Sequence, residues 1–146
     1  MKVLVTGGNG FIGSAVVRHL ISRTDHSVIN VDKMTYAATA QAVDAVRSSD
    51  RYTQIVADIC DATAINQIFE TERPDAVMHL AAESHVDRSI DGPSAFVETN
   101  LLGTFTMLEA ARHQGVARFH HVSTDCLLYT SPSPRDATLS RMPSSA

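Results

Sequence analysis

The sequence has few of the residues that mark secreted, metal-binding or membrane proteins. Only two of its 146 residues are cysteines, Cys60 and Cys126, and no Cys-x-x-Cys pair occurs. These two residues cannot build a disulfide framework or a cysteine-based metal site, so a cytoplasmic location fits best. Purely apolar runs extend over a handful of residues, which is too few to span a bilayer.

A strong charge imbalance is lacking as well. The formal net charge is -4, which gives no reason to expect nucleic acid or an anionic membrane as a partner. Hydrophobic residues make up 44% of the chain, enough to bury a sizeable core in one domain or in part of a larger one.

Short apolar runs alternate with helical patterns up to residue 125. Such runs are typical of strands buried on both faces of a parallel sheet. They occur at residues 2–8, 27–32, 51–59, 75–82 and 117–124. Helical patterns occupy residues 11–22, 62–70 and 92–115, and the connection 35–50 is expected to hold a short helix. The alternation predicts an α/β fold, a Rossmann-type doubly wound parallel sheet with strand order 3-2-1-4-5.

Three further expectations concern particular residues and faces of these elements. Asp61 is expected to cap the helix that follows it. The helix at 92–115 is apolar on more than one side, so one face is expected to meet the sheet and another a partner. One of His120 and His121, both inside the fifth strand, is expected to point into the core.

The segment "TGGNGFIG" places Gly7, Gly10 and Gly13 between the first strand and the first helix. Glycines there allow a sharp turn and a close approach of the backbone to a pyrophosphate, which the helix N-terminus also attracts. The alternative is a tight strand-to-helix turn with no ligand. Asp32 supports the nucleotide interpretation, because it ends the second strand 19 residues after Gly13. Its carboxylate can accept hydrogen bonds from the ribose hydroxyls and repels a 2′-phosphate, so it favours NAD over NADP. The positive charge of Lys33 weakens that preference slightly.

Polar residues also end the other strands, at the carboxyl edge where open sheets bind ligands. Asp58 ends the third strand, and Ser123, Thr124 and Asp125 end the fifth. A hydroxyl and an acid at the fifth strand could position a substrate oxygen and donate a proton. Ordinary capped strand ends are the alternative. In the "ESHVDRS" loop, His85, Asp87 and Arg88 suit anion or hydroxyl contacts or a solvated salt-bridged loop, with no third metal ligand evident.

Together these stretches resemble the extended short-chain dehydrogenase/reductase superfamily. Within it, "LAAESHVDRSIDGPSAFVETN" and "HHVSTD" are similar to the dTDP-glucose 4,6-dehydratase family, and the resemblance is nearly continuous over residues 1–125. At the position of Asp125 related epimerases usually have Ser or Ala, and GDP-mannose dehydratases usually have Ser.

The resemblance implies an NAD-dependent hydro-lyase that converts dTDP-glucose to its 4-keto-6-deoxy product and forms a homodimer. Asp125 and Thr124 are the implied catalytic residues, and Ser84 and Thr124 the implied sugar contacts. The implied cofactor contacts are Gly7, Gly10, Phe11, Ile12, Gly13, Asp32, Lys33, Met34, Thr35, Asp58, Ile59, Leu80, Ala81, Ala82, Glu83, Ser84 and Thr99.

The sequence departs from the family after Asp125. The family uses a Tyr-x-x-x-Lys pair at the C4 hydroxyl and a Glu directly after the Asp. Here Cys126 takes the Glu position and no Tyr-x-x-x-Lys occurs. The chain itself is therefore expected to be inactive. A nucleotide-sugar epimerase or decarboxylase of the same superfamily, or an NAD-binding module without catalysis, are the alternatives.

The last residues suggest an explanation for this departure. "CLLYTSPSPRD" and "SRMPSSA" match the translation of the two ends of a transposase-based sequencing adapter. Residues 1–125 are therefore expected to be an incomplete NAD-binding domain, truncated after the fifth strand, and residues 126–146 a non-native tail. A natural disordered tail is the rival explanation, since Pro and Ser enrichment favours disorder.

Overall fold

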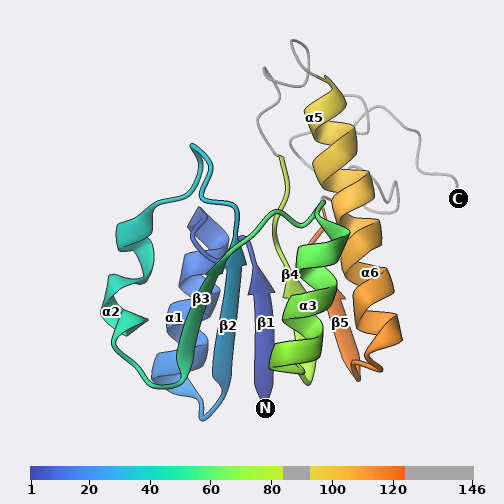
Figure 1. The fold of residues 1–146 in the computed structure, drawn as a ribbon. Helices are drawn as coiled ribbons and strands as arrows, with labels where there is room; N and C mark the ends of the chain where they lie inside the picture. Colours follow the sequence, from blue (N-terminus) through green and yellow to red (C-terminus); the bar gives the residue numbers. More distant parts are fainter. Residues whose placement is uncertain (84–92, 124–146) are drawn as a thin grey trace, which may run out of the picture.

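A computed structural model of the protein describes residues 1–83 and 93–123 (Figure 1). These residues form a five-stranded parallel sheet in the order β3-β2-β1-β4-β5, which confirms the predicted topology. The strands are β1 (Lys2–Thr6), β2 (Ser27–Asp32), β3 (Tyr52–Val56), β4 (Ala76–His79) and β5 (Arg118–His121).

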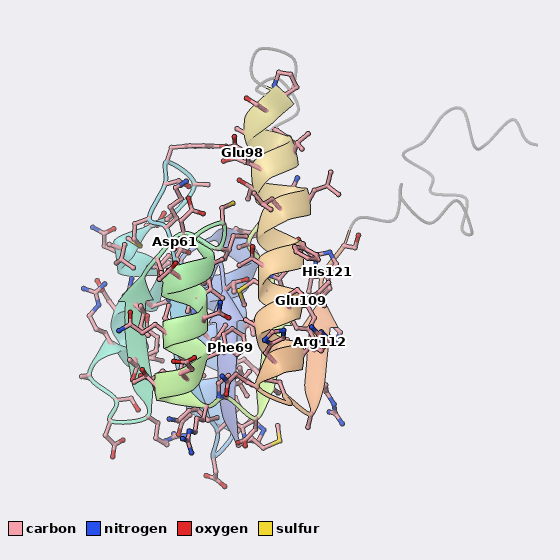
Figure 2. All side chains as sticks on the ribbon, turned by 45° about the vertical axis from the view of Figure 1, so that its right-hand side comes forward. Asp61, Phe69, Glu98, Glu109, Arg112 and His121 are labelled. Atoms are coloured by element: carbon pink, nitrogen blue, oxygen red, sulfur yellow. The ribbon has the colours of Figure 1, made fainter. Side chains whose placement is uncertain are left out.

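Helices cover both faces of the sheet. One face carries α1 (Phe11–Arg23), the 3-10 turn η1 (Ala40–Val43) and α2 (Asp44–Arg47), so the connection 35–50 does hold a short helix. The other face carries α3 (Ala62–Glu72) and a long helical segment of α5 (Pro93–Val97), η2 (Glu98–Gly103) and α6 (Thr104–His113). Asp61 caps α3 as predicted, because its carboxylate accepts the N–H groups of Thr63 and Ala64 at 3.0 Å each (Figure 2).

The core consists of two clusters separated by the sheet. Leu4 and Ile29 point to one face, where they pack with Phe69 of α3 and Met107 of α6. Neighbouring strand residues, among them Val5, point to the opposite face and pack against α1 and α2. Because both faces are buried, the strand sequences are continuous apolar runs rather than alternating ones.

The helix predicted at 92–115 is observed, with a feature that apolar spacing did not predict. Its middle part, η2, is π-helical. Gly103 at the end of η2 lies against the loop after β3, where a Cβ would be 2.6 Å from Ile59 Cδ1. Gly115, with φ +65°, follows the helix as predicted.

This long helix is apolar on two faces, as expected. Met107 is fully buried against the sheet. Large apolar side chains remain exposed on the other side: Val97, Leu101, Leu102, Phe105 and Leu108. Polar residues also lie on α6, where Arg112 donates to Glu109 at 2.9 Å (Figure 2).

The expectation for the fifth strand was wrong. Both His120 and His121 are exposed, and Phe119 is the residue of β5 that packs against the core. Because β5 is the edge strand of the described sheet, its neighbours cover it incompletely. The buried imidazole belongs instead to His79 of β4. None of the described helices is long and apolar enough to cross a membrane.

Candidate functional site

Most of the predicted site residues lie at the carboxyl ends of β1, β2, β3 and β4. β1 leads into α1 on one face, and its neighbour β4 leads toward the long helix on the other. The chain therefore leaves the sheet in opposite directions between β1 and β4, which is where open α/β sheets bind ligands.

Two of the three predicted glycines are required by the packing of the turn itself. Gly7 has φ +70°, and a Cβ on it would lie 2.9 Å from the backbone nitrogen and Cα of Ala81. A Cβ on Gly13 would lie 2.0 Å from the carbonyl oxygen of Gly7. Gly7 thus brings the turn against the chain after β4, and Gly13 brings α1 against the turn.

Gly10 is less tightly constrained by internal packing than the other two glycines. Its backbone angles, φ -76° and ψ 175°, are open to any residue, but a Cβ would lie 3.2 Å from the Gly7 carbonyl oxygen, a tight contact that requires a shift of a few tenths of an ångström. As the N-cap of α1 it offers no side-chain acceptor, and the first turn of α1 holds no acidic residue. The positive end of the helix dipole is therefore left for an external anion. Phe11, 95% exposed, and Ile12 stand beside this position.

Asp32 lies beside the glycine turn with a fixed carboxylate. The side chain is buried, with Oδ2 accepting the Asn9 N–H at 2.9 Å and Oδ1 accepting the Met34 N–H at 2.8 Å. Met34 itself adopts φ 57°, a left-handed backbone conformation. Each carboxylate oxygen keeps further acceptor capacity, as a pair of ribose hydroxyls requires.

Lys33 is engaged by Asp58. Their side chains form an ion pair at the ends of β2 and β3, and the hydrogen bond to Asp58 raises the pKa of Lys33. For Asp58, partial burial alone would raise the pKa. The hydrogen bonds from Lys33 and from the Cys60 N–H outweigh burial, so the pKa of Asp58 is lowered. The ammonium group of Lys33 therefore already has an anionic partner.

The chain after β4 is held by a buried threonine. Thr6 Oγ1 accepts the N–H groups of Leu80 at 3.2 Å and Ala81 at 3.1 Å, which turns the chain away from the strand direction. β4 consequently ends at His79 although the apolar sequence continues to Ala82.

The same hydroxyl fixes the tautomer of His79. Thr6 Oγ1 lies 2.7 Å from His79 Nδ1, and because it already accepts two N–H groups, its own hydrogen points to Nδ1. The imidazole proton is therefore on Nε2, 3.1 Å from Thr104 Oγ1 at the start of α6. Burial, with a contribution from the nearby His121, lowers the pKa of His79 to about 4.

The end of this segment is attached to η2. Asn100 Oδ1 accepts the Glu83 N–H at 2.9 Å, and Asn100 Nδ2 donates to the Glu83 carbonyl at 3.0 Å. Across the site, Tyr36 donates to the Glu83 carboxylate at 2.9 Å. Thr99, next to Asn100, is half-buried in η2.

The structure thus brings most of the predicted cofactor residues to one edge of the sheet. Thr35 and Ala82 are there too, both exposed. The predicted catalytic and sugar-binding residues Ser84, Thr124 and Asp125 lie outside the described residues, as does the cluster of His85, Asp87 and Arg88. No group of three or more His, Cys, Asp or Glu side chains suited to a metal ion occurs in residues 1–83 and 93–123.

Sequence reasoning missed a buried polar network beneath the glycine turn. Asn9, Asn30, Tyr52 and Gln54 are linked by hydrogen bonds of 2.7 to 3.2 Å. Gly8, outside the predicted triplet, belongs to it, since a Cβ there would lie 2.1 Å from Asn30 Oδ1. Asn30 and Gln54 interrupt apolar strand sequences, and that interruption was the available signal.

Comparison with known proteins agrees with this geometry. The family model for GDP-mannose 4,6 dehydratase matches residues 4–129. The chain belongs to the GDP-mannose 4,6-dehydratase family. Among curated members, dTDP-glucose 4,6-dehydratase of Shigella flexneri is 57% identical over 146 residues, covering 94% of this chain and 40% of the relative. The resemblance to dTDP-glucose 4,6-dehydratases is therefore confirmed, and the chain spans about two fifths of their length.

Solved structures agree with the family assignment. A dTDP-glucose 4,6-dehydratase from Streptomyces venezuelae, crystallised with NAD and TYD bound, superposes with a TM-score of 0.80 at 45% identity. The match covers 86% of this chain and 40% of that one. A UDP-glucose 4-epimerase from Thermotoga maritima, crystallised with UDP-glucose, gives a TM-score of 0.77 at 35% identity, covering 85% and 38%. The fold is thus shared between dehydratases and epimerases.

The buried neutral His79 predicts a pH-dependent stability. Its pKa is about 4 in the folded chain against an ordinary value of 6.5, so the unfolded chain binds a proton between these values and the folded chain does not. Stability from this group is complete above pH 6.5 and falls as the pH drops toward 4, by roughly 3 kcal/mol in all. Between pH 7 and pH 5 the expected loss is about 2 kcal/mol.

Urea unfolding at these two pH values measures this loss. In His79→Gln the loss of stability between pH 7 and pH 5 should be smaller by about 2 kcal/mol. His19 is an exposed histidine on α1, so His19→Gln should leave this loss unchanged. An undiminished pH dependence in His79→Gln would show that another group is responsible.

Proposed function

We propose that the chain is the NAD-binding part of a dTDP-glucose 4,6-dehydratase. The observation that carries the proposal is the geometry of the glycine turn. Gly7 and Gly13 are required by packing, whereas Gly10 has ordinary backbone angles and a single tight contact, and it caps a helix N-terminus without side-chain acceptors. A pyrophosphate placed there explains Gly10, and the NAD bound to the Streptomyces venezuelae relative supports its identity.

The described residues suit the parts of this cofactor. Gly10 and the first residues of α1 would hold the pyrophosphate, and Asp32, Met34 and Thr35 the adenosine ribose. Asp58 and Ile59 would contact the adenine. The segment from Leu80 to Glu83 would line the nicotinamide side together with Thr99.

When bound, NAD supplies a hydride acceptor and then a hydride donor. Within the chain, Ser84 and Thr124 would contact the sugar, and Asp125 would donate the proton that the departing C6 hydroxyl takes up. Asp125 also favours a dehydratase over an epimerase, in which that position is usually Ser or Ala. The homodimer expected for the whole protein would use the exposed apolar face of the long helix, which is of the kind that protein partners cover.

Residues 126–146 form no part of the proposed site. We propose that they are translated adapter sequence rather than part of the enzyme. Sequencing the gene from its source decides this, because a natural tail would be encoded there and an adapter would not.

Gly10→Ala tests the proposed function most directly. The backbone angles at residue 10 accept alanine, and the contact of its Cβ with the Gly7 carbonyl needs only a small shift, so the free energy of unfolding should change by about 1 kcal/mol. The added methyl group would obstruct the pyrophosphate, so the Kd for NAD in isothermal titration calorimetry should rise about tenfold or more.

Gly115→Ala is the matched control for this substitution. Gly115 has φ +65° and nothing within 4 Å of an added Cβ, so alanine should cost about 1 kcal/mol of stability through backbone strain. Its affinity for NAD should stay at the wild-type value. Unchanged NAD affinity in Gly10→Ala would contradict the proposed pyrophosphate position.

The chain should prefer NAD to NADP. Asp32 would face the 2′-phosphate with like charge, and Lys33 is already paired with Asp58, so NAD should bind about tenfold more tightly or better. Asp32→Asn removes the charge and should narrow the ratio of the two Kd values, while Asp50→Asn, at an exposed position, should not. Equal affinities in the wild-type chain would refute the role given to Asp32.

The 146-residue chain should not form the 4-keto product from dTDP-glucose and NAD. It encodes no Tyr-x-x-x-Lys pair, and Cys126 stands where the family has Glu. A thiol is mostly protonated at neutral pH unless activated, and loss of a general base typically costs about 10² to 10⁴ in rate. An assay beside a full-length relative checks this, and turnover above the blank would be the contrary result. Replacing 126–146 with the C-terminal portion of such a relative should restore activity.

A further inference from the structure

Asn9 is the most highly connected residue beneath the glycine turn. Its side chain is buried, and each of its polar groups has a partner elsewhere in the chain. Asn9 Oδ1 accepts from Asn30 Nδ2 of β2 at 2.7 Å and from Gln54 Nε2 of β3 at 3.1 Å. Asn9 Nδ2 donates to the Thr39 carbonyl at 3.3 Å, and the Asn9 carbonyl accepts the Thr39 N–H at 2.9 Å.

These contacts leave one group of Asn9, its backbone N–H, which donates to Asp32 Oδ2 at 2.9 Å. The opposite oxygen of Asp32 is held by the Met34 N–H. Two backbone N–H donors thus orient the carboxylate. The first of them, the Asn9 N–H, is fixed in space because the hydrogen bonds of the Asn9 side chain hold that residue in place. The glycine turn cannot move closer to β2, because Gly8 already packs against Asn30 of that strand.

We infer that Asn9 is a positioning residue for cofactor specificity, which acts through Asp32. By fixing its own peptide it directs the free lone pairs of Asp32 toward two ribose hydroxyls and keeps the charge where a 2′-phosphate would lie. The inference rests on the proposed NAD site, which it deepens by naming what makes that site selective.

A purely structural role of Asn9 predicts something different. Removing a buried hydrogen-bonding side chain lowers the stability of the fold and so reduces the folded fraction. The binding of NAD and the binding of NADP are then weakened to the same extent. A positioning role changes the ratio of the two Kd values, because only the unphosphorylated ribose uses the oriented carboxylate.

Asn9→Ala should raise the Kd for NAD about tenfold and the Kd for NADP less than about threefold, since a hydrogen bond to a charged group is being weakened. Gln54→Ala, which removes one of the two donors to Asn9 Oδ1, should change the ratio in the same direction by a smaller factor. If Asn9→Ala does not fold, the change of the Kd ratio in Gln54→Ala tests the inference in its place. Asn66→Ala, an exposed asparagine on α3, should leave the ratio unchanged.

A double-mutant cycle with Asp32→Asn tests whether Asn9 acts through Asp32. Once the carboxylate is gone, adding Asn9→Ala should change the NAD-to-NADP ratio no further. The inference is overturned if the ratio is unmoved in Asn9→Ala and Gln54→Ala, or if Asn9→Ala changes it equally with and without Asp32. Failure of the wild-type chain to bind NAD at all would instead overturn the proposed function, and this inference with it.

Discussion

Close backbone packing around Gly7 is the constraint on which the rest of the site depends. The turn after β1 lies so near the chain after β4 that no side chain fits between Gly7 and Ala81, and α1 lies so near the turn that none fits at Gly13. These two contacts set the height of the α1 N-terminus above the sheet. They also set the distance between the two segments proposed to enclose the dinucleotide.

Buried polar networks hold the two sides of this turn. On the β4 side, Thr6 and a neutral His79 connect the turn of Leu80 and Ala81 to the start of α6. On the β2 side, Asn9 connects the glycine turn to Asn30, Gln54 and Asp32. Polar groups are costly to bury unless they are satisfied, and among the described residues Asn30 Oδ1 alone is a buried side-chain polar atom without a partner, so each network favours one arrangement of its loops over alternatives. The site is accordingly pre-shaped by the chain itself.

Much of this could be predicted from the sequence, because the dominant signals were local. Apolar runs and helical spacing indicated the five strands and their order, and Gly7 with Asp32 indicated the ligand edge of the sheet. The role of Asn9 could not be predicted in the same way, since its partners at Asn30, Thr39 and Gln54 become neighbours only when β2 and β3 are paired. The histidines of β5 were misjudged for a related reason. Burial at an edge strand depends on which helices reach it, and strand sequence does not contain that information.

The central claim is that the glycine turn and Asp32 form one dinucleotide site. Titrating NAD into the ¹⁵N-labelled chain and following its backbone amide resonances tests this claim most directly. The account predicts saturable shifts at Gly10, Phe11, Ile12 and Gly13 of the turn and at Met34 beside Asp32. Saturable shifts confined to other surfaces, such as the outer side of α3 or the exposed face of β5, with the turn amides unmoved, would contradict it.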